Sequence, residues 1–389
     1  MASALVETST DVVVVGSGPA GLAVGACLRR AGIDFILLEK EQTLAPAWRR
    51  HYDRLHLHTD RSHSGLPYLP MPKSYPRYPS RVQVIEYFEA YAKAFSLTPR
   101  FGEEVVEARW GEGAWELRTQ VARYRACALV LATGYNAAPV RPHWPGMEGY
   151  QGVLLHSSEY RSGGRFRGQD ALVVGFGNSG GEIAIDLFEH GARPSVVVRG
   201  TVNLLPRELL GIPILSWAVV LSQLPPRVAD LLSAPLLRMT FGDLSRLGLR
   251  KAPAGPMTEL SSRKRVPLID VGTVALIRAK SIQVRPAIRE FTRTGVIFDD
   301  GAEASYQAIV LATGYQHQLA RLLGEVDGVL DAAGQAVTSG RETTRPHLYL
   351  CGFYVAPTGM IREAGIEARR IVDGVSRQLR AAVSEPSRE

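Results

Sequence analysis

The chain has 389 residues, of which 46% are hydrophobic and 21% charged, which excludes a disordered chain and allows two domains with separate cores. Its net charge of +7 comes from scattered basic residues, and the one compact basic run, residues 263–265, is interpreted as a solvated loop, so no nucleic-acid partner is indicated. The three cysteines form no C-x-x-C pair, so we do not expect a disulfide reductase. No apolar run reaches about 18 residues, so we expect no membrane-spanning helix. The N-terminus lacks a signal pattern, and we therefore expect a cytoplasmic location.

The first predicted element is an apolar strand at residues 11–15, which leads through a glycine-rich turn into a helix. The turn consists of Gly16, Ser17, Gly18, Pro19, Ala20 and Gly21. A strand, a tight turn and a helix N-terminus with free N–H groups form the setting that binds a dinucleotide pyrophosphate. A second strand at residues 35–38 ends in Glu39, which Lys40 follows. Because a carboxylate at that place accepts hydrogen bonds from a ribose 2′-hydroxyl, we predict that this site, Glu39 and Lys40 included, binds FAD.

A basic, proline-rich excursion follows at residues 45–79. It contains four histidines, His51, His56, His58 and His63. No two of them share a helix face beside a carboxylate, so we expect no metal site. Residues 82–95 have helical spacing, and Ser80 is the expected N-cap.

A second apolar strand at residues 171–174 leads into a turn of the same kind. This turn consists of Gly175, Phe176, Gly177, Asn178, Ser179 and Gly180. The next strand, residues 195–198, ends in Arg199, where the first site has its acid. A guanidinium there, aided by Thr201, can pair with a 2′-phosphate, so the second site is predicted to bind NADPH. Two dinucleotides in one chain imply electron transfer between them.

The pentapeptide Leu-Ala-Thr-Gly-Tyr occurs at residues 131–135 and again at 311–315, each time after an apolar strand. The two copies suggest two crossings between a host domain and an inserted domain. We therefore predict an α/β fold of two Rossmann-like dinucleotide-binding domains, with the NADP domain inserted into the FAD domain. The FAD domain would comprise residues 1–150 and 316–389, and the NADP domain residues 151–315. The cofactor sites are expected to include the loop residues Thr133, Gly134, Thr313 and Gly314.

Residues 204–239 form a hydrophobic stretch that several prolines interrupt. Two interpretations are open: short helices that roof the active site, which we favour, or a peripheral membrane contact. After a strand at residues 348–350, Gly352 and a turn at residues 357–359 precede a long helix at residues 360–383. The N–H groups at the start of this helix can face an electron-rich ring or a pyrophosphate oxygen, and the helix can also serve in packing.

Residues 150–160 resemble the flavin-containing monooxygenase pattern F-x-G-x-x-x-H-x-x-x-[YF], with Tyr150 in place of Phe. Further stretches resemble the YUCCA-type indole-3-pyruvate monooxygenases within this class B group, over roughly residues 10–375. They lie at residues 48–58, 78–79, 198–211 and 267–273. Related Baeyer–Villiger monooxygenases usually carry Trp at the place of Tyr160, and residues 354–362 depart from the plant pattern.

The resemblance implies an NADPH- and FAD-dependent monooxygenase that forms a C4a-hydroperoxyflavin and inserts one oxygen atom of O2 into a small organic substrate. For a YUCCA-type member, that substrate would be an arylpyruvate such as indole-3-pyruvate, which loses carbon dioxide. The resemblance also places Trp48, His58 and Gly352 at the cofactors, and makes His58 and Arg61 the candidate catalytic residues, with His58 where many animal relatives have Asn. The alternatives are N- or S-oxygenation, an NADPH-dependent flavin oxidase or reductase serving a partner, and a non-catalytic NADP(H)-binding redox sensor.

Overall fold

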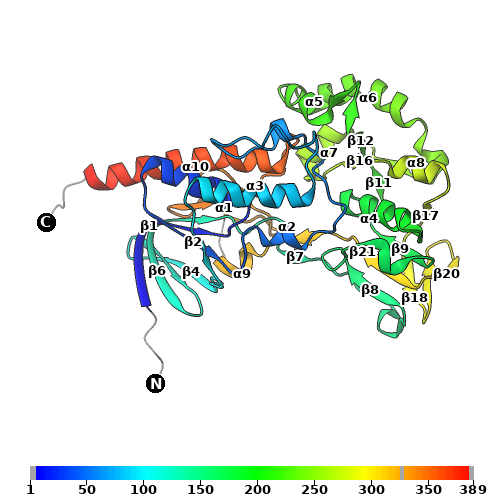
Figure 1. The fold of residues 1–389 in the computed structure, drawn as a ribbon, viewed down its shortest axis with the longest axis horizontal. Helices are drawn as coiled ribbons and strands as arrows, with labels where there is room; N and C mark the ends of the chain where they lie inside the picture. The colour runs from blue at the N-terminus through cyan, green and yellow to red at the C-terminus, as the bar shows by residue number, and fades with distance from the viewer. Residues whose placement is uncertain (1–5, 325–327, 385–389) are drawn as a thin grey trace. The chain divides into compact units, whose positions relative to one another are not determined.

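The computed structural model describes residues 6–324 and 328–384, which form a mixed α/β protein (Figure 1). The chain divides into two compact units. The first unit runs up to Arg49, continues from Arg61 to Ala138 and resumes at Gln316. The second unit consists of Arg50–Asp60 and Pro139–Tyr315.

Two segments that we expected in the FAD domain, residues 50–60 and 139–150, belong to the second unit. Their hydrogen bonds and buried side chains explain this assignment. The Val140 N–H donates to the Gly314 carbonyl at 3.0 Å, which ties the start of the second segment to this unit. Tyr52, from the first segment, is buried in the hydrophobic core of the same unit.

The first unit contains a seven-stranded sheet of order β3-β2-β1-β6-β5-β4, in which β23 also pairs with β6. Its strands are β1 (Val6–Val15), β2 (Phe35–Glu39), β3 (Arg100–Phe101), β4 (Glu107–Gly111), β5 (Ala114–Arg118), β6 (Ala122–Leu131) and β23 (Leu348–Leu350). Helix α1 packs against both α3 and α10. The helices are α1 (Pro19–Ala31), α2 (Pro46–Arg50, at the unit boundary), η1 (Arg61–His63), α3 (Arg81–Ala94), α9 (Leu319–Leu323) and α10 (Met360–Ser384).

Local sequence accounts for the main elements of this unit. Val12, Val13 and Val14 of β1 are fully buried, as expected for a central parallel strand covered on both faces. Helix α3 begins at a capping box, in which the Ser80 hydroxyl accepts from the Gln83 N–H and the Gln83 side chain accepts from the Ser80 N–H. The predicted N-cap is therefore confirmed.

The second unit contains a parallel sheet of order β17-β10-β9-β21-β8 and a three-stranded antiparallel sheet, β18-β19-β20. Their strands are β8 (Val153–His156), β9 (Asp170–Val174), β10 (Arg193–Val197), β17 (Gln283–Arg285), β18 (Ile288–Phe291), β19 (Gly295–Phe298), β20 (Glu303–Ser305) and β21 (Ala308–Leu311). Helix α4 (Asn178–Glu189) follows β9 and packs on β10.

Short elements connect β10 to β17, precede β8 or β9, or lie at the chain crossings. The strands are β7 (Ala138–Pro139), β11 (Thr201–Val202), β12 (Leu204–Pro206), β13 (Glu208–Leu209), β14 (Ile212–Pro213), β15 (Arg250–Lys251), β16 (Leu268–Asp270) and β22 (Tyr315–Gln316). The helices are η2 (Met147–Gly149), η3 (Gly163–Phe166), α5 (Ile214–Leu221), α6 (Pro226–Phe241), η4 (Leu244–Leu247), α7 (Pro256–Arg263) and α8 (Thr273–Arg278). Across the described residues, we find no helix with the length and apolar character needed to cross a membrane.

The two units repeat one plan, β1–α1–β2 beside β6 and β9–α4–β10 beside β21. The repeated pentapeptide lies at the end of β6 in one unit and of β21 in the other. Each copy therefore runs alongside the glycine turn of its own unit. The Ala132 N–H donates to Val15 and the Ala312 N–H to Val174, the last residue of the strand before each turn.

Candidate functional site

The first glycine turn has two positions where the protein itself excludes a side chain and one where it does not. A Cβ on Gly16, whose φ is +108°, would lie 2.5 Å from the Ala132 carbonyl oxygen. A Cβ on Gly21 would lie 1.8 Å from the Gly16 carbonyl oxygen. Gly18 is extended, with φ of −75° and ψ of −175°, and a Cβ there would meet no atom within 4 Å. The open space at Gly18 is where a ligand can approach the backbone closely.

The second turn has the same arrangement. Gly175, at φ +115°, would place a Cβ 2.5 Å from the Ala312 carbonyl oxygen, and Gly180 would place one 2.1 Å from the Gly175 carbonyl oxygen. Gly177 has φ of −105°, and a Cβ there would again meet nothing within 4 Å. Neither α1 nor α4 has a side-chain N-cap or an acidic residue in its first turn. Both helix starts therefore suit an anionic group such as a pyrophosphate.

Glu39 lies at the end of β2 as a buried, oriented carboxylate. Its Oε2 accepts hydrogen bonds from the Ser17 N–H and hydroxyl, both at 2.8 Å, and its Oε1 accepts from the Glu41 N–H at 3.0 Å. The turn and the acid are thus linked directly, which the sequence alone did not indicate. Lys40 is exposed beside them.

Arg199 is exposed two residues after β10, and it is not the only cation there. Arg250 donates to the Arg199 carbonyl at 2.8 Å, and Arg265 donates to both the carbonyl and the hydroxyl of Thr201. Residues 263–265 are exposed, but they begin on the last residue of α7 rather than in a loop, and Arg265 is held against the end of the predicted 2′-phosphate site. Arg250 and Arg265 were not predicted as site residues, because each comes close to Arg199 or Thr201 only through contacts between distant parts of the chain. By contrast, Arg263 forms an ion pair with Glu259.

The other predicted residues of the second turn have contacts within the protein. The Asn178 side chain accepts from the Ile269 N–H at 2.8 Å, and therefore joins α4 to β16. Ser179 hydrogen-bonds to Tyr52, and Phe176 packs against the core of the second unit. In the first turn, Pro19 occupies the first position of α1.

The two pentapeptide loops differ in their contacts. Gly134 and Gly314 have φ of +89° and +87°, and a Cβ on either would meet nothing within 4 Å. Thr313 donates from its hydroxyl to the Val140 carbonyl, whereas Thr133 is half-buried. The backbone of both loops therefore remains open beside its glycine turn.

The residues of the monooxygenase-like pattern brace the second unit. The Tyr150 hydroxyl donates to the Tyr306 carbonyl at 2.8 Å, and a Cβ on Gly152 would collide with the Tyr150 hydroxyl. The Tyr160 hydroxyl donates to Asp186 of α4 at 2.5 Å, and burial raises the pKa of Tyr160. These contacts assign Tyr150 and Tyr160 to packing within the second unit rather than to bond-making chemistry.

His156, the histidine of this pattern, is fully buried. The Ser158 N–H donates to its Nδ1 at 3.1 Å, so Nε2 carries the proton and donates to the Gly314 carbonyl at 3.1 Å. Burial lowers the pKa of His156 below its ordinary value. The neutral ring therefore holds the second pentapeptide loop in place.

His58, a predicted catalytic and cofactor-binding residue, pairs through Nε2 with the carboxylate of Glu182 on α4, and its buried Nδ1 has no hydrogen-bond partner. Arg61, the other predicted catalytic residue, belongs to the first unit, where its guanidinium donates to the Tyr75 carbonyl. The two predicted catalytic residues therefore belong to different units, and each is engaged within its own.

Trp48 and Gly352, two further predicted cofactor-binding residues, lie in the first unit, like Arg61. Trp48 contacts the Phe88 ring edge-on, with centroids 5.8 Å apart. Gly352, at φ +86°, donates its N–H to Glu367 of α10 at 2.6 Å, and a Cβ there would lie 3.0 Å from the Ala20 side chain. Gly352 is thus next to the start of α1. Burial raises the pKa of Glu367 to about 7, and no sequence pattern had indicated this residue.

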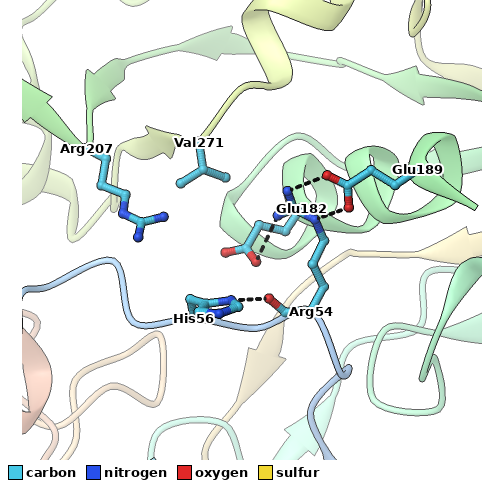
Figure 2. A pocket seen from close by; sticks show the side chains of 6 residues that line it. All are labelled: Arg54, His56, Glu182, Glu189, Arg207 and Val271. Carbon is cyan, nitrogen blue, oxygen red and sulfur yellow. Dashed lines mark hydrogen bonds and ion pairs between the residues drawn. The ribbon is translucent and has the colours of Figure 1, made fainter. Parts of the chain in front are cut away.

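A cleft within the second unit lies beside α4 (Figure 2). It is lined by Arg54, His56, Glu182, Glu189, Arg207 and Val271. Arg54 makes a two-pronged ion pair with Glu189, with distances of 2.8 and 2.9 Å. None of the six was predicted as a site residue, although Arg54, His56, Arg207 and Val271 lie in the stretches that carried the family resemblance. Among the described residues, no group of three or more His, Cys, Asp or Glu side chains could hold a metal ion.

Comparisons with known proteins agree on the type of fold. Residues 13–205 match the family model described as pyridine nucleotide-disulphide oxidoreductase. The chain is 42% identical to indole-3-pyruvate monooxygenase YUCCA1 of Oryza sativa subsp. japonica over 83% of this chain and 80% of that protein. It is 38% identical to indole-3-pyruvate monooxygenase YUCCA6 of Arabidopsis thaliana, over 94% and 90%.

Two solved structures show the same fold at lower identity. A flavin-containing monooxygenase from Stenotrophomonas maltophilia has a TM-score of 0.74 and 24% identity, covering 95% of this chain and 99% of that one. Cyclohexanone monooxygenase from Rhodococcus sp. Phi1, bound to NADP⁺, has a TM-score of 0.72 and 19% identity, covering 96% and 85%.

The contrast between Gly18 and Gly21 can be tested directly. Gly18→Val is expected to keep the fold but to lose bound flavin, because its side chain would fill only the space left for a ligand. Gly21→Ala should instead lower the free energy of unfolding by about 3 kcal/mol, because its Cβ would collide with backbone that cannot move aside. Flavin absorbance and thermal unfolding measure both effects. Full flavin retention in Gly18→Val would contradict the assignment of this turn.

The buried His156 predicts acid-sensitive stability. The unfolded chain protonates this histidine near its ordinary pKa of about 6.5, whereas the folded protein resists protonation, so stability is lost as pH falls from about 6.5 through the lower folded pKa. His156→Gln, which can still donate to Gly314, should weaken this loss between pH 7.5 and 5.5 in urea unfolding. Part of the acid-induced loss of stability should remain in this variant, because burial also lowers the pKa of His317.

His156→Ala serves as the comparison. It removes one of the two donors to the Gly314 carbonyl, which keeps the Val140 N–H, and it leaves a cavity at a fully buried site, so it is expected to cost about 2 kcal/mol at pH 7.5. An acid dependence in His156→Gln equal to that of the natural protein would assign the acid sensitivity to other groups.

Proposed function

The chain belongs to the YUCCA family of indole-3-pyruvate monooxygenases, and we propose that it converts an arylpyruvate such as indole-3-pyruvate to the shortened arylacetate. It is a flavin-dependent monooxygenase that uses FAD and NADPH. The observation that carries the proposal is the duplicated glycine turn, open at Gly18 and Gly177, in a chain with this family relationship. An enzyme that transfers electrons from one dinucleotide to another needs two pyrophosphate sites, here called cradles, each formed by a glycine turn and the helix N-terminus after it.

In our proposal, FAD binds the first unit and NADP(H) the second, which interrupts the chain of the first. The buried Glu39 carboxylate, oriented by Ser17, supports FAD at the first turn because it can accept from a ribose hydroxyl. Arg199 and Arg265 support a 2′-phosphate at the second turn, where a guanidinium can form charge-assisted hydrogen bonds. FAD and NADPH, when bound, supply the redox chemistry and the activation of O2.

The overall reaction balances with one O2 and one NADPH. The bond between the keto carbon and the carboxylate breaks, one oxygen atom joins the keto carbon, and carbon dioxide leaves. NADPH and a proton provide the electrons and hydrogens that reduce the other oxygen atom to water. The protein's part is to bind and orient the two cofactors and the substrate and to exclude water.

His58 is proposed to act at the cofactors through Nδ1. Because Nε2 pairs with Glu182, the ring orientation is set by α4, whose N-terminus forms the second cradle. The unpartnered Nδ1 is the atom that can interact with a bound ligand. Arg61 is proposed to support the neighbouring loop through Tyr75.

The basic residues after β10 predict the coenzyme preference. Arg199→Ala should narrow the preference for NADPH over NADH by roughly ten- to a hundred-fold, because a charge-assisted pair contributes about 1.5–3 kcal/mol. Arg265→Ala should have an effect in the same direction, and the double variant a larger one. Steady-state kcat/KM for both coenzymes measures it. The matched control is Arg263→Ala, from the same run but paired with Glu259, and a loss there equal to that of Arg265→Ala would contradict the assignment.

Product analysis under ¹⁸O2 tests the substrate class. With arylpyruvates, tertiary amines and thioethers as candidates, we expect arylpyruvates to speed NADPH consumption and to yield the arylacetate with one ¹⁸O atom and carbon dioxide. Oxygenation of an amine or thioether, with arylpyruvates inert, would instead support the N- or S-oxygenase alternative. Hydrogen peroxide as the only product with every candidate would support a flavin oxidase.

A further inference from the structure

Helix α6 of the second unit exposes its apolar side chains. Leu231 and Met239 are 74% and 82% exposed, and they belong to a row of residues with spacings of three and four. The outer face of α6 consists of Val228, Leu231, Leu232, Pro235 and Met239. These positions fall on one side of an α-helix, so the helix has an apolar stripe directed away from its own unit.

The opposite side of α6 packs against the second unit, and these contacts fix the orientation of the helix. Ala229 and Phe241 are buried there. Asp230 accepts hydrogen bonds from the Met257 and Thr258 N–H groups at the start of α7, at 2.9 and 3.0 Å. Rotation of α6 to hide its stripe would break these bonds and expose its buried residues.

The apolar surface continues along the chain toward α5. Val220, near the end of α5, is 64% exposed, and Leu224 in the following turn is also exposed. Figure 1 shows α5 and α6 at the same edge of the second unit. Exposed apolar side chains gathered at one edge of a unit mark an interaction surface.

Basic residues border the outer face. Arg227 and Arg238 are both exposed, and at about 100° per residue they lie along the same border of the stripe. The acid of this helix, Asp230, lies on the attached side. An apolar stripe with arginines at its border is the arrangement of helices that lie in a membrane interface, where the guanidinium groups reach the lipid headgroups.

We propose that the outer face of α6 binds the surface of an anionic phospholipid bilayer. The helix has 16 residues and rises about 24 Å, less than the roughly 30 Å of a hydrocarbon core, so it lies in the interface rather than across it. Self-association through this face fits the charges less well, because a second copy presents the same arginines, whereas anionic lipid neutralises them. This inference is independent of the proposed reaction, and it favours the membrane contact over the active-site roof for this helix.

Vesicle flotation with the full-length holoenzyme tests the proposal. Vesicles of phosphatidylcholine with 30% phosphatidylglycerol should bind the protein at low salt, and pure phosphatidylcholine vesicles should bind it several-fold less. The double variant Leu231→Glu/Leu232→Glu should reduce binding more than ten-fold. Arg227→Gln/Arg238→Gln should remove most of the preference for anionic vesicles while keeping the weaker apolar binding.

Val121→Glu is the matched control, because Val121 is 59% exposed outside this face and its substitution should leave vesicle binding unchanged. All variants should keep flavin content and thermal stability, since they change exposed side chains. Failure of the natural protein to bind anionic vesicles, or equal binding by the Leu231→Glu/Leu232→Glu variant, would overturn the proposal. A concentration-dependent dimer abolished by that variant would assign the face to a second copy instead.

Discussion

Two carbonyl oxygens impose the constraint on which the structure depends. Those of Ala132 and Ala312 lie 2.5 Å from the points where Gly16 and Gly175 would carry a Cβ, so only glycine allows the loop after one strand to approach the turn after its neighbour. This close packing sets the start of α1 and of α4 against its sheet with N–H groups directed outward. It also accounts for the repeated pentapeptide, because the same loop is needed beside each turn. The two glycine turns are built around these contacts. So are the side chains beside them, Glu39 at the first turn and Arg199 and Arg265 at the second.

Local patterns were sufficient to predict what is local. The strands and turns at both glycine motifs, the Ser80 cap and the long C-terminal helix follow from residues close in sequence. Contacts between distant segments could not be predicted in this way. Glu367 of α10 accepts from the Gly352 N–H, 15 residues earlier, and Arg265 reaches Thr201 across more than sixty residues. The assignment of residues 50–60 to the second unit also depends on tertiary packing, because nothing in their own composition indicates the surface that they cover.

The most recognisable family pattern has a structural explanation. Tyr160 and His156 each donate to an acceptor within the second unit, the buried Asp186 carboxylate in one case and the Gly314 carbonyl in the other. Both contacts hold parts of the second unit around α4 and its neighbouring loop. A pattern can therefore identify an enzyme family without containing a group that touches substrate. This view directs attention for chemistry to side chains with an uncommitted atom, such as Nδ1 of His58.

The chain passes between its two units four times, at residues 49/50, 60/61, 138/139 and 315/316. The short excursion at residues 50–60 contributes Tyr52 to the second core and places His58 against Glu182. A gene fragment that encodes only residues 139–315 would therefore produce a unit with a hole in its core, and its buried Glu182 carboxylate would lack both Arg54 and His58 as partners. Recombination at the boundaries 138/139 and 315/316 alone would therefore exchange an incomplete second unit. A functional exchange between related genes must also carry the eleven residues 50–60.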